Sequence, residues 1–214
     1  MSKVILSIAY LPPVQYFTKI FQHSNVLIES LENYTKQTYR NRCVILGANG
    51  PLALTIPVIK TQGNHTPIKL VEIDNSTLWQ KNHWKAIESA YRTSAYFEFL
   101  ADVLLPYYTH RYSNLFEYDT LLLNSILEFI SVSPRINQTT SYLPKYDYDT
   151  YDCRNEISPK VDYRIDKQFV PLEYFQAFSN KYGFVPNLSI IDLLFNEGLS
   201  AIEIIDASLK RPVE

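Results

Sequence analysis

The sequence predicts a mixed α and β fold, either α+β or α/β, in a single domain that spans residues 1–214. Two observations support this fold class. Short apolar runs with the character of β-strands fill the first third of the chain, whereas helical periodicity begins only after it. In addition, 46% of the residues are hydrophobic and 20% are charged, which is typical of a globular domain. We therefore expect a mixed sheet, built mostly from the N-terminal third, that is covered by C-terminal helices.

Four short apolar runs predict buried strands, at residues 4–9, 25–30, 52–58 and 68–73. The first run is stopped by Pro12 and Pro13, which remove backbone donors and direct the chain into a loop. Residues 16–22 then have the pattern of one or two helical turns. Asn49 and Gly50 precede the third run, and an Asn-Gly pair is a strong signal for a hairpin turn.

Side chains of alternating character between residues 36 and 45 predict a further strand. The three cations of this stretch would share one face, where guanidinium groups can hold a phosphate or carboxylate through paired hydrogen bonds. The alternative is a solvated strand face whose cations pair with acidic neighbours. The opposite face is also polar, and polar side chains are costly to bury without partners. The candidate ligand-binding residues of this strand are Lys36, Tyr39, Arg40, Asn41 and Arg42.

Helical patterns follow, at residues 78–92, 96–108, 114–131, 171–179, 189–198 and 201–210. Asn114 precedes Glu117 by three residues, a spacing that predicts the start of a helix. The same spacing predicts capping boxes at Thr77–Gln80, Ser189–Asp192 and Ser200–Glu203. Gly198 predicts the C-terminal end of a helix, because glycine readily adopts a positive φ angle. Helix capping therefore explains the serine and aspartate near residue 190 better than catalysis does.

The predicted helix at residues 78–92 carries a candidate catalytic residue. His83 lies one helical turn after Trp79, so the two side chains can meet. The unperturbed pKa of a histidine is near neutrality, which makes His83 the candidate general acid or base. The alternative is a packed tryptophan beside a histidine whose polar atoms are satisfied by hydrogen bonds.

Residues 133–168 form a long, polar, tyrosine-rich segment with little regular periodicity. A segment of this length in a compact chain is more often a functional loop or lid than a neutral connector. Arg154 and Lys160 are its candidate contacts to an anion. Cys153 directly precedes Arg154, and a neighbouring cation lowers a thiol pKa. The alternative is that Cys153 is an incidental loop thiol.

Composition and missing motifs exclude several classes of protein. The net charge of −2 gives no general attraction to nucleic acid, and no apolar run approaches the ~20 residues that span a bilayer. The first apolar run lacks a cleavage site, and the chain has only two cysteines, so we expect a cytoplasmic protein. The five glycines form no nucleotide-binding motif, and the four histidines lack metal-ligand spacing. We expect no cofactor and no metal site, and nothing specifies an oligomeric state.

Six blocks of the sequence, in family order, resemble the WbqC-like family of bacterial proteins. They are AYLPPVQYF (9–17), ENYTKQTYRNRC (32–43), LTIPV (54–58), WQKNHWKAIESAY (79–91), RNEISPK (154–160) and PNLSIIDLLFNEG (186–198). The likeness covers nearly the whole chain. It departs near the start, where Ser7-Ile8 and Pro13-Val14-Gln15 stand in place of the Gln-Pro and Trp-x-Gly of many members.

The resemblance implies a role in the synthesis of O-antigen or another surface polysaccharide. It adds Trp84 and Lys85 to the candidate ligand-binding residues, because both lie in a matched block. The first hypothesis is an intracellular enzyme, such as a transferase, that acts on a nucleotide-linked or lipid-linked sugar. Its ligand would be a small anionic molecule or a sugar, and Trp79 or Trp84 would stack on the ring. The alternative is a non-catalytic binding or scaffolding component of polysaccharide assembly.

These hypotheses make different structural predictions. In the enzyme, Arg40 and Arg42 would hold the anionic part of the substrate and His83 would act as acid or base. We then expect one pocket where these three residues converge with the segment at residues 133–168. In a scaffold, we expect the same groups to be scattered, with a broad exposed aromatic patch.

Overall fold

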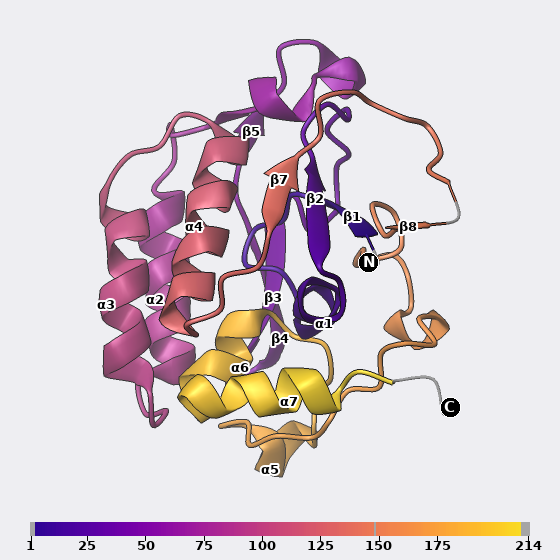
Figure 1. Cartoon of the computed structure of the whole chain (residues 1–214). Coiled ribbons are helices and arrows are strands. Elements are labelled where there is room, and N and C mark those ends of the chain that lie inside the picture. The colour runs from indigo at the N-terminus through magenta and orange to yellow at the C-terminus, as the bar shows by residue number, and fades with distance from the viewer. Residues whose placement is uncertain (1–2, 148, 211–214) are drawn as a thin grey trace.

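Four parallel strands form the central sheet of the protein, in the order β7-β2-β1-β8 (Figure 1). The computed structural model describes residues 3–147 and 149–210. The strands are β1 (Lys3–Ser7), β2 (Asn25–Glu29), β7 (Ile136–Gln138) and β8 (Thr150–Asp152). Val4, Ile5 and Leu6 are completely buried, because β1 is a central strand with chain packed on both of its faces. The predicted fold class is confirmed.

Helices pack around this sheet. They are α1 (Val14–Gln22), α2 (Trp79–Tyr91), α3 (Phe97–Thr109), α4 (Leu115–Phe129), α5 (Ser179–Tyr182), α6 (Ile190–Glu197) and α7 (Ala201–Ala207). α1 connects the parallel strands β1 and β2, while α2, α3 and α4 pack side by side on the left of Figure 1. α6 and α7 contact α1 below the sheet. Within the described residues, every helix is too short or too polar to cross a bilayer.

Two antiparallel pairs of strands lie outside the main sheet. They are β3 (Arg42–Gly47) with β4 (Gly50–Thr55), and β5 (Val58–Ile59) with β6 (Glu72–Ile73). The predicted hairpin is confirmed by the first pair. Its two turn residues are Ala48 and Asn49, and Gly50 follows with a φ of 102°, which favours glycine.

The predicted strand at residues 36–45 is wrong in its first half, since β3 begins only at Arg42. The chain before it forms a turn instead. Gln37 has a φ of 59°, and the Thr38 hydroxyl donates to the carbonyl of Thr35 at 2.7 Å. These local contacts compete with strand pairing. The three predicted cations therefore do not share one strand face.

Three other segments also differ from expectation. Residues 68–73 contain a short 3-10 helix, η2 (Ile68–Leu70), before β6 begins. The structure describes residues 171–179, and it has no helix there before α5 begins at residue 179. In contrast, the tyrosine-rich segment supplies both outer strands of the main sheet, β7 and β8, which the sequence pattern did not indicate. Each of these strands has three residues, too few for a visible alternation.

Among the predicted helix caps, only that of α4 forms as expected. The Asn114 side chain accepts a hydrogen bond from the backbone N–H of Glu117 at 2.9 Å. No side-chain cap forms at the starts of α2, α6 or α7. At α6, the Ser189 hydroxyl donates instead to the carbonyl of Leu11, so it joins the loop after β1 to the helix. The Asp192 carboxylate points into the core and accepts its hydrogen bonds from side chains there, so it does not complete the capping box.

Gly198 ends α6 as predicted, and we expect Gly198→Ala to destabilise the protein. Gly198 has a φ of 55°, and a Cβ atom there would lie 2.5 Å from the ring of Tyr96. Backbone strain and a steric clash would each cost about 1–3 kcal/mol. Urea denaturation measures the loss. Gly183→Ala is the matched control, because Gly183 also ends a helix, at a φ of 67°, but faces open space. Equal losses in both variants would contradict the clash with Tyr96.

Candidate functional site

The carboxyl ends of three parallel strands meet at one edge of the main sheet, and each strand ends in a polar residue. These residues are Ser7 of β1, Glu29 of β2 and Asp152 of β8. In the sheet, β1 has β2 on one side and β8 on the other. β2 is the next strand of this sheet along the chain and β8 is its last strand, so the strand order reverses at β1. In open parallel sheets, ligands bind outside the carboxyl ends of the strands at such a point. This edge is the candidate functional site.

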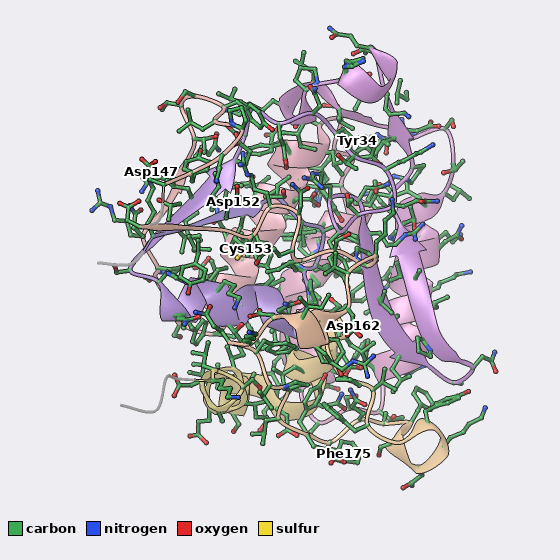
Figure 2. All side chains as sticks on the ribbon, turned by 90° about the vertical axis from the view of Figure 1, so that its right-hand side faces the viewer. Tyr34, Asp147, Asp152, Cys153, Asp162 and Phe175 are labelled. Carbon is green, nitrogen blue, oxygen red and sulfur yellow. The ribbon has the colours of Figure 1, made fainter. Side chains whose placement is uncertain are left out.

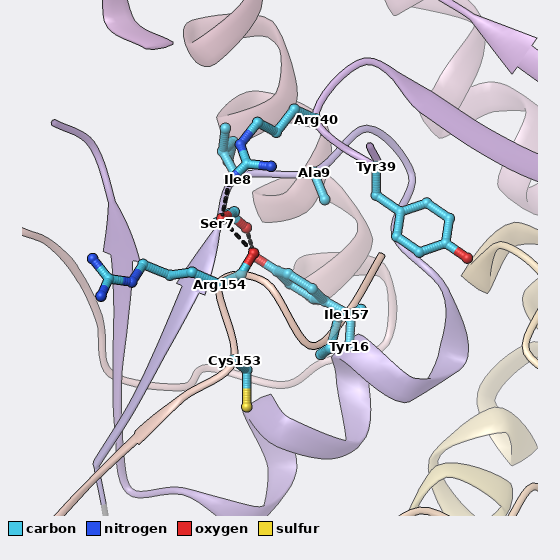
Figure 3. A pocket seen from close by; sticks show the side chains of 9 residues that line it. All are labelled: Ser7, Ile8, Ala9, Tyr16, Tyr39, Arg40, Cys153, Arg154 and Ile157. Atoms are coloured by element: carbon cyan, nitrogen blue, oxygen red, sulfur yellow. Dashed lines mark hydrogen bonds between the residues drawn. The ribbon is translucent and has the colours of Figure 1, made fainter. Parts of the chain in front are cut away.

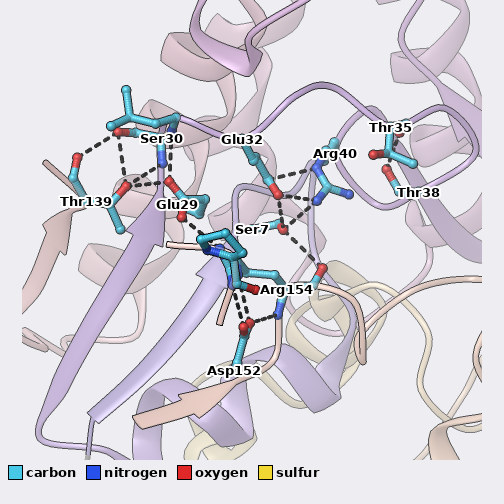
Figure 4. A network of polar contacts seen from close by, with 12 residues as sticks. Ser7, Glu29, Ser30, Glu32, Thr35, Thr38, Arg40, Thr139, Asp152 and Arg154 are labelled. Carbon is cyan, nitrogen blue, oxygen red and sulfur yellow. Dashed lines mark hydrogen bonds and ion pairs between the residues drawn. The ribbon is translucent and has the colours of Figure 1, made fainter. Parts of the chain in front are cut away.

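Arg154 occupies the centre of a polar network at this edge (Figure 4). Its Nε and Nη2 donate to the carboxylate of Asp152, and its Nη1 donates to Glu29 at 3.1 Å. Nη1 and Nη2 also donate to the carbonyls of Leu143 and Pro144, at 2.9 and 3.4 Å. A guanidinium has five N–H donors, and all of those in Arg154 are used. Arg154 therefore joins the ends of β2 and β8 to the chain at Leu143 and Pro144, and it has no donor left for the anion that we predicted.

Arg40 forms a second buried ion pair with Glu32. Its Nε donates to Oε1 of Glu32 at 2.9 Å, and its Nη2 donates both to Oε2 and to the hydroxyl of Ser7. The Ser7 hydroxyl lies 3.1 Å from the Glu32 carboxylate and 3.1 Å from the carbonyl of Arg154, and it can donate to one of them. Ser7 thus links the two ion pairs. Within the described residues, Nη1 of Arg40 has no hydrogen-bond partner.

Two cavities lie beside these ion pairs, and both Arg40 and Arg154 line each of them. The main cavity has a volume of about 270 Å³. It lies between the β2–β3 connection, to which Tyr34 belongs, and the tyrosine-rich segment, to which Asp152 belongs. Both of these residues are labelled in Figure 2. Its lining residues are Leu31, Glu32, Asn33, Thr35, Arg40, Tyr142, Pro144, Arg154 and Asn155. The small cavity, of about 10 Å³, adjoins Tyr16 and Tyr39 and has room for one water molecule (Figure 3).

Aromatic side chains hold the tyrosine-rich segment in place. The guanidinium of Arg154 lies 5.3 Å from the ring centroid of Tyr142 and 5.0 Å from that of Tyr146. Such contacts are attractive because the face of an aromatic ring is electronegative. Tyr142 remains half exposed and also lines the main cavity. The predicted loop is therefore an ordered wall of the cavity.

The thiol of Cys153 does not fit the hypothesis of an activated nucleophile. Burial raises the pKa of Cys153 to about 12, so the thiol stays protonated at neutral pH. The cation of Arg154 does not offset this effect, because its charge is neutralised by Glu29 and Asp152. In Figure 3 the sulfur points away from Ser7 and Tyr16.

His83 and Trp79 lie in the packed core beneath the hairpin and α3, and neither lines a cavity beside Arg40. The Nδ1 atom of His83 is 3.0 Å from the hydroxyl of Tyr10, and its ring meets that of Trp79 edge to face at 5.2 Å. Burial lowers the pKa of His83 to about 4, so the ring is neutral at neutral pH. The structure thus does not bring His83 together with Arg40, because the apolar stripe of α2 is buried in the core.

The other predicted residues are divided between the core and the surface. Asn41 is buried, with its amide donating to the carbonyl of Ile56 at 2.7 Å, and Arg42 donates to the hydroxyl of Thr55 at 3.1 Å. Trp84 packs on the ring of Tyr108, with ring centroids 5.6 Å apart. Among the predicted site residues, Lys36, Lys85 and Lys160 are exposed lysines. Lys85 lies on α2, whereas the Nζ atom of Lys160 donates to the carbonyl of Lys36 at 3.4 Å.

Sequence reasoning missed the acidic half of the site. Glu29, Glu32 and Asp152 were not candidates, although Arg40 and Arg154 were. The signal for Glu29 was present, because a charged residue directly ends an apolar strand whose carboxyl end faces a ligand site in this type of sheet. Glu32 has no comparable signal, since its role depends on the turn that brings Arg40 back to it.

The fold and the site together define an α/β protein with an open parallel sheet and a polar cavity at the point where the strand order reverses. The chain belongs to the WbqC-like protein family, whose sequence pattern matches residues 9–165. It is also similar to "Uncharacterized protein Rv1507c" of Mycobacterium tuberculosis (strain ATCC 25618 / H37Rv). The two are 30% identical over 229 aligned positions, which cover 94% of this chain and 96% of the relative. No solved structure matches the chain.

Proposed function

We propose that the protein is an intracellular enzyme that acts on a nucleotide-linked or lipid-linked sugar in the synthesis of a surface polysaccharide. The main cavity carries this proposal. Its walls combine a carboxylate and a guanidinium with the amides of Asn33 and Asn155 and the ring of Tyr142. Polar groups that can both donate and accept suit sugar hydroxyls, and an aromatic ring suits the apolar face of a sugar.

The size of the cavity favours a sugar ring as its occupant. At about 270 Å³, it lies at the lower end of the ~300–1,000 Å³ range of small-molecule sites. A whole nucleotide-linked sugar would extend out of it. We propose that its phosphates lie at the rim, where Lys36 follows the lining residue Thr35 and the ammonium of Lys160 is in contact with the Lys36 backbone. Lysine is suited to phosphate as a mobile point charge.

Transfer of a group to a sugar hydroxyl requires a base near that hydroxyl. We propose Glu32 for this role in place of His83, because Glu32 lines the cavity and His83 does not. Tyr39 and Arg40 remain candidate ligand-binding residues, since Arg40 lines both cavities and Tyr39 lines the small one.

Replacing the two lysines at the rim tests the proposal. We expect the double variant Lys36→Ala, Lys160→Ala to weaken the binding of a nucleotide-linked sugar by about tenfold, because two partly screened cations each contribute up to ~1 kcal/mol. Calorimetric titration with UDP-glucose, GDP-mannose and dTDP-rhamnose measures this. The control is Lys81→Ala, Lys181→Ala, which removes one exposed lysine from α2 and one from α5. Failure of all three ligands to bind the wild-type protein, or equal losses in both double variants, would contradict the proposal.

The alternative, a non-catalytic binding or scaffolding component, is supported by a different observation. Large apolar side chains are exposed on the segment that follows the site. Ile165 is 71% exposed, Val170 54% and Phe175 64%. Phe175 lies at the lower end of the face in Figure 2, away from Asp152. A scaffold would bind a partner protein through such side chains, and alanine substitution of Phe175 would then abolish the complex without affecting sugar binding.

A further inference from the structure

A further cavity lies between α4 and β7, which are side by side in Figure 1. We call it the apolar cavity. Its volume is about 220 Å³, and it is separate from the candidate site, since neither Arg40 nor Arg154 lines it. Its hydrophobic lining residues are Ile8, Ile28, Phe116, Leu123 and Ile136. The first four of these side chains are at most 6% exposed, so the inner wall of the cavity is part of the core.

A space of this size beside the core is unusual. Protein interiors are close-packed, and few voids in them are larger than a water molecule. Hydrophobic walls offer water no hydrogen bonds, and cavities with such walls take up apolar molecules instead. A sugar would lose the hydrogen bonds that its hydroxyls make to water. The inner wall therefore favours an apolar occupant.

The mouth of the apolar cavity is polar. Three exposed carboxamide side chains line it without a hydrogen bond to any described residue. They are Asn124, Asn137 and Gln138. The ammonium of Lys69 lies 5.6 Å from the ring centroid of Phe116, which forms part of the wall. Lys69 is exposed and has no ion pair within the described residues, not even with Glu117 on the same helix as Phe116. Its charge is thus available to an anion.

We infer that the apolar cavity binds the aliphatic chain of an amphiphile whose head group is a carboxylate or a phosphate. The chain packs against Ile8, Ile28 and Leu123, and the head group lies at the mouth, beside the cation of Lys69. An apolar cavity of ~150 Å³ holds one benzene molecule, so this cavity holds a chain of roughly eight carbon atoms. The inference goes beyond the proposed function and does not depend on it, because the sugar is assigned to the main cavity.

A series of straight-chain acids tests the inference on the wild-type protein. Butanoate, hexanoate, octanoate, decanoate and dodecanoate are titrated, and saturation-transfer NMR measures their affinities. Each methylene group that leaves water should strengthen binding about fourfold. We expect this gain to end once the cavity is full, so that dodecanoate binds no more tightly than decanoate. Octyl phosphate is titrated in parallel with octanoate, and the tighter ligand shows whether a lipid phosphate or a free acid is the source.

Thr120→Met locates binding in the apolar cavity. Thr120 lines the cavity from α4, and its hydroxyl donates only to the carbonyl of Phe116 in the same helix, at 2.6 Å. Methionine therefore fills the space without breaking a contact between elements. We expect the affinity for octanoate to fall about tenfold or more. The urea midpoint should rise, because filling a cavity stabilises a protein, and this rise shows that the variant is folded.

Lys69→Ala tests the position of the head group. It should weaken the binding of octanoate about threefold, as for an exposed ion pair, and leave the binding of 1-octanol unchanged. The matched control is Lys81→Ala, which removes an exposed lysine from α2 and should affect neither ligand.

Four results would overturn the inference. They are no binding by any acid or by octyl phosphate, an undiminished gain from decanoate to dodecanoate, full octanoate binding by a folded Thr120→Met variant, and equal effects of Lys69→Ala on octanoate and 1-octanol. None of these results bears on the proposed function, which is tested by nucleotide-linked sugars. Thr120→Met should bind UDP-glucose as the wild-type protein does, which distinguishes the two cavities.

Discussion

Arg154→Met should lower the free energy of unfolding by about 3–5 kcal/mol, because it leaves two carboxylates without their shared cation. Glu29 is completely buried, and Asp152 is half-buried beside it. The variant also loses the hydrogen bonds from Arg154 to the carbonyls of Leu143 and Pro144, which anchor the cavity wall. Urea denaturation at neutral pH measures the change.

A matched control for this prediction is Arg164→Met. Arg164 also pairs with an aspartate two residues before it, but its side chain is 76% exposed. We expect no measurable loss from that variant, since water replaces the pair. Adding Glu29→Met to Arg154→Met should restore part of the stability, because one unpaired buried charge is removed. If the Arg154 and Arg164 variants are equally stable, the network does not hold the sheet and the cavity wall together.

Asp119→Asn should stabilise the protein by about 2–3 kcal/mol at pH 8. Asp119 lies on α4, is completely buried, and neither of its carboxylate oxygens has a partner within the described residues. Burial raises the pKa of this carboxyl well above its usual value of 3.8. The folded protein therefore binds a proton there that the unfolded chain releases as pH rises.

The pH dependence provides the clearest measurement of this effect. A group whose pKa is raised by folding contributes its stability below the unfolded pKa and loses it as pH rises towards the folded pKa. Wild type and Asp119→Asn should thus unfold alike near pH 3.8 and diverge towards pH 8, with wild type the less stable. Glu128→Gln removes an exposed carboxylate from the same helix and should show no such divergence. Parallel curves for wild type and Asp119→Asn would contradict the prediction.

Local signals in the sequence predicted the parts of the fold that depend on neighbouring residues. The hairpin at Asn49 and the helix start at Asn114 both follow from contacts within a few residues. The cap at Ser189 failed because its hydroxyl instead bonds the carbonyl of Leu11, which is 178 positions away in the chain. Tertiary contacts of this kind leave no trace in the spacing of residues.

The same distinction explains which parts of the candidate site were predictable. Arg40 and Arg154 were found because guanidinium groups in a polar context are an identifiable residue type. Their partners were not found, since Glu29 meets Arg154 only when β2 and β8 flank β1 in the sheet. His83 appeared functional because its pKa is near neutrality in water, and burial changes that property without changing the sequence around it.

The wall of the main cavity and the two outer strands of the sheet belong to one piece of chain. Tyr142 and Pro144 lie between β7 and β8 in the chain, and Arg154 lies two residues beyond the end of β8. Under the proposed function, the surface that binds the ligand is thus part of the sheet architecture and not an appended loop. Under the proposed function, substitutions in this segment that changed the preferred sugar would also alter the edges of the sheet. A change in the proposed sugar specificity is therefore limited by the need to keep the sheet stable.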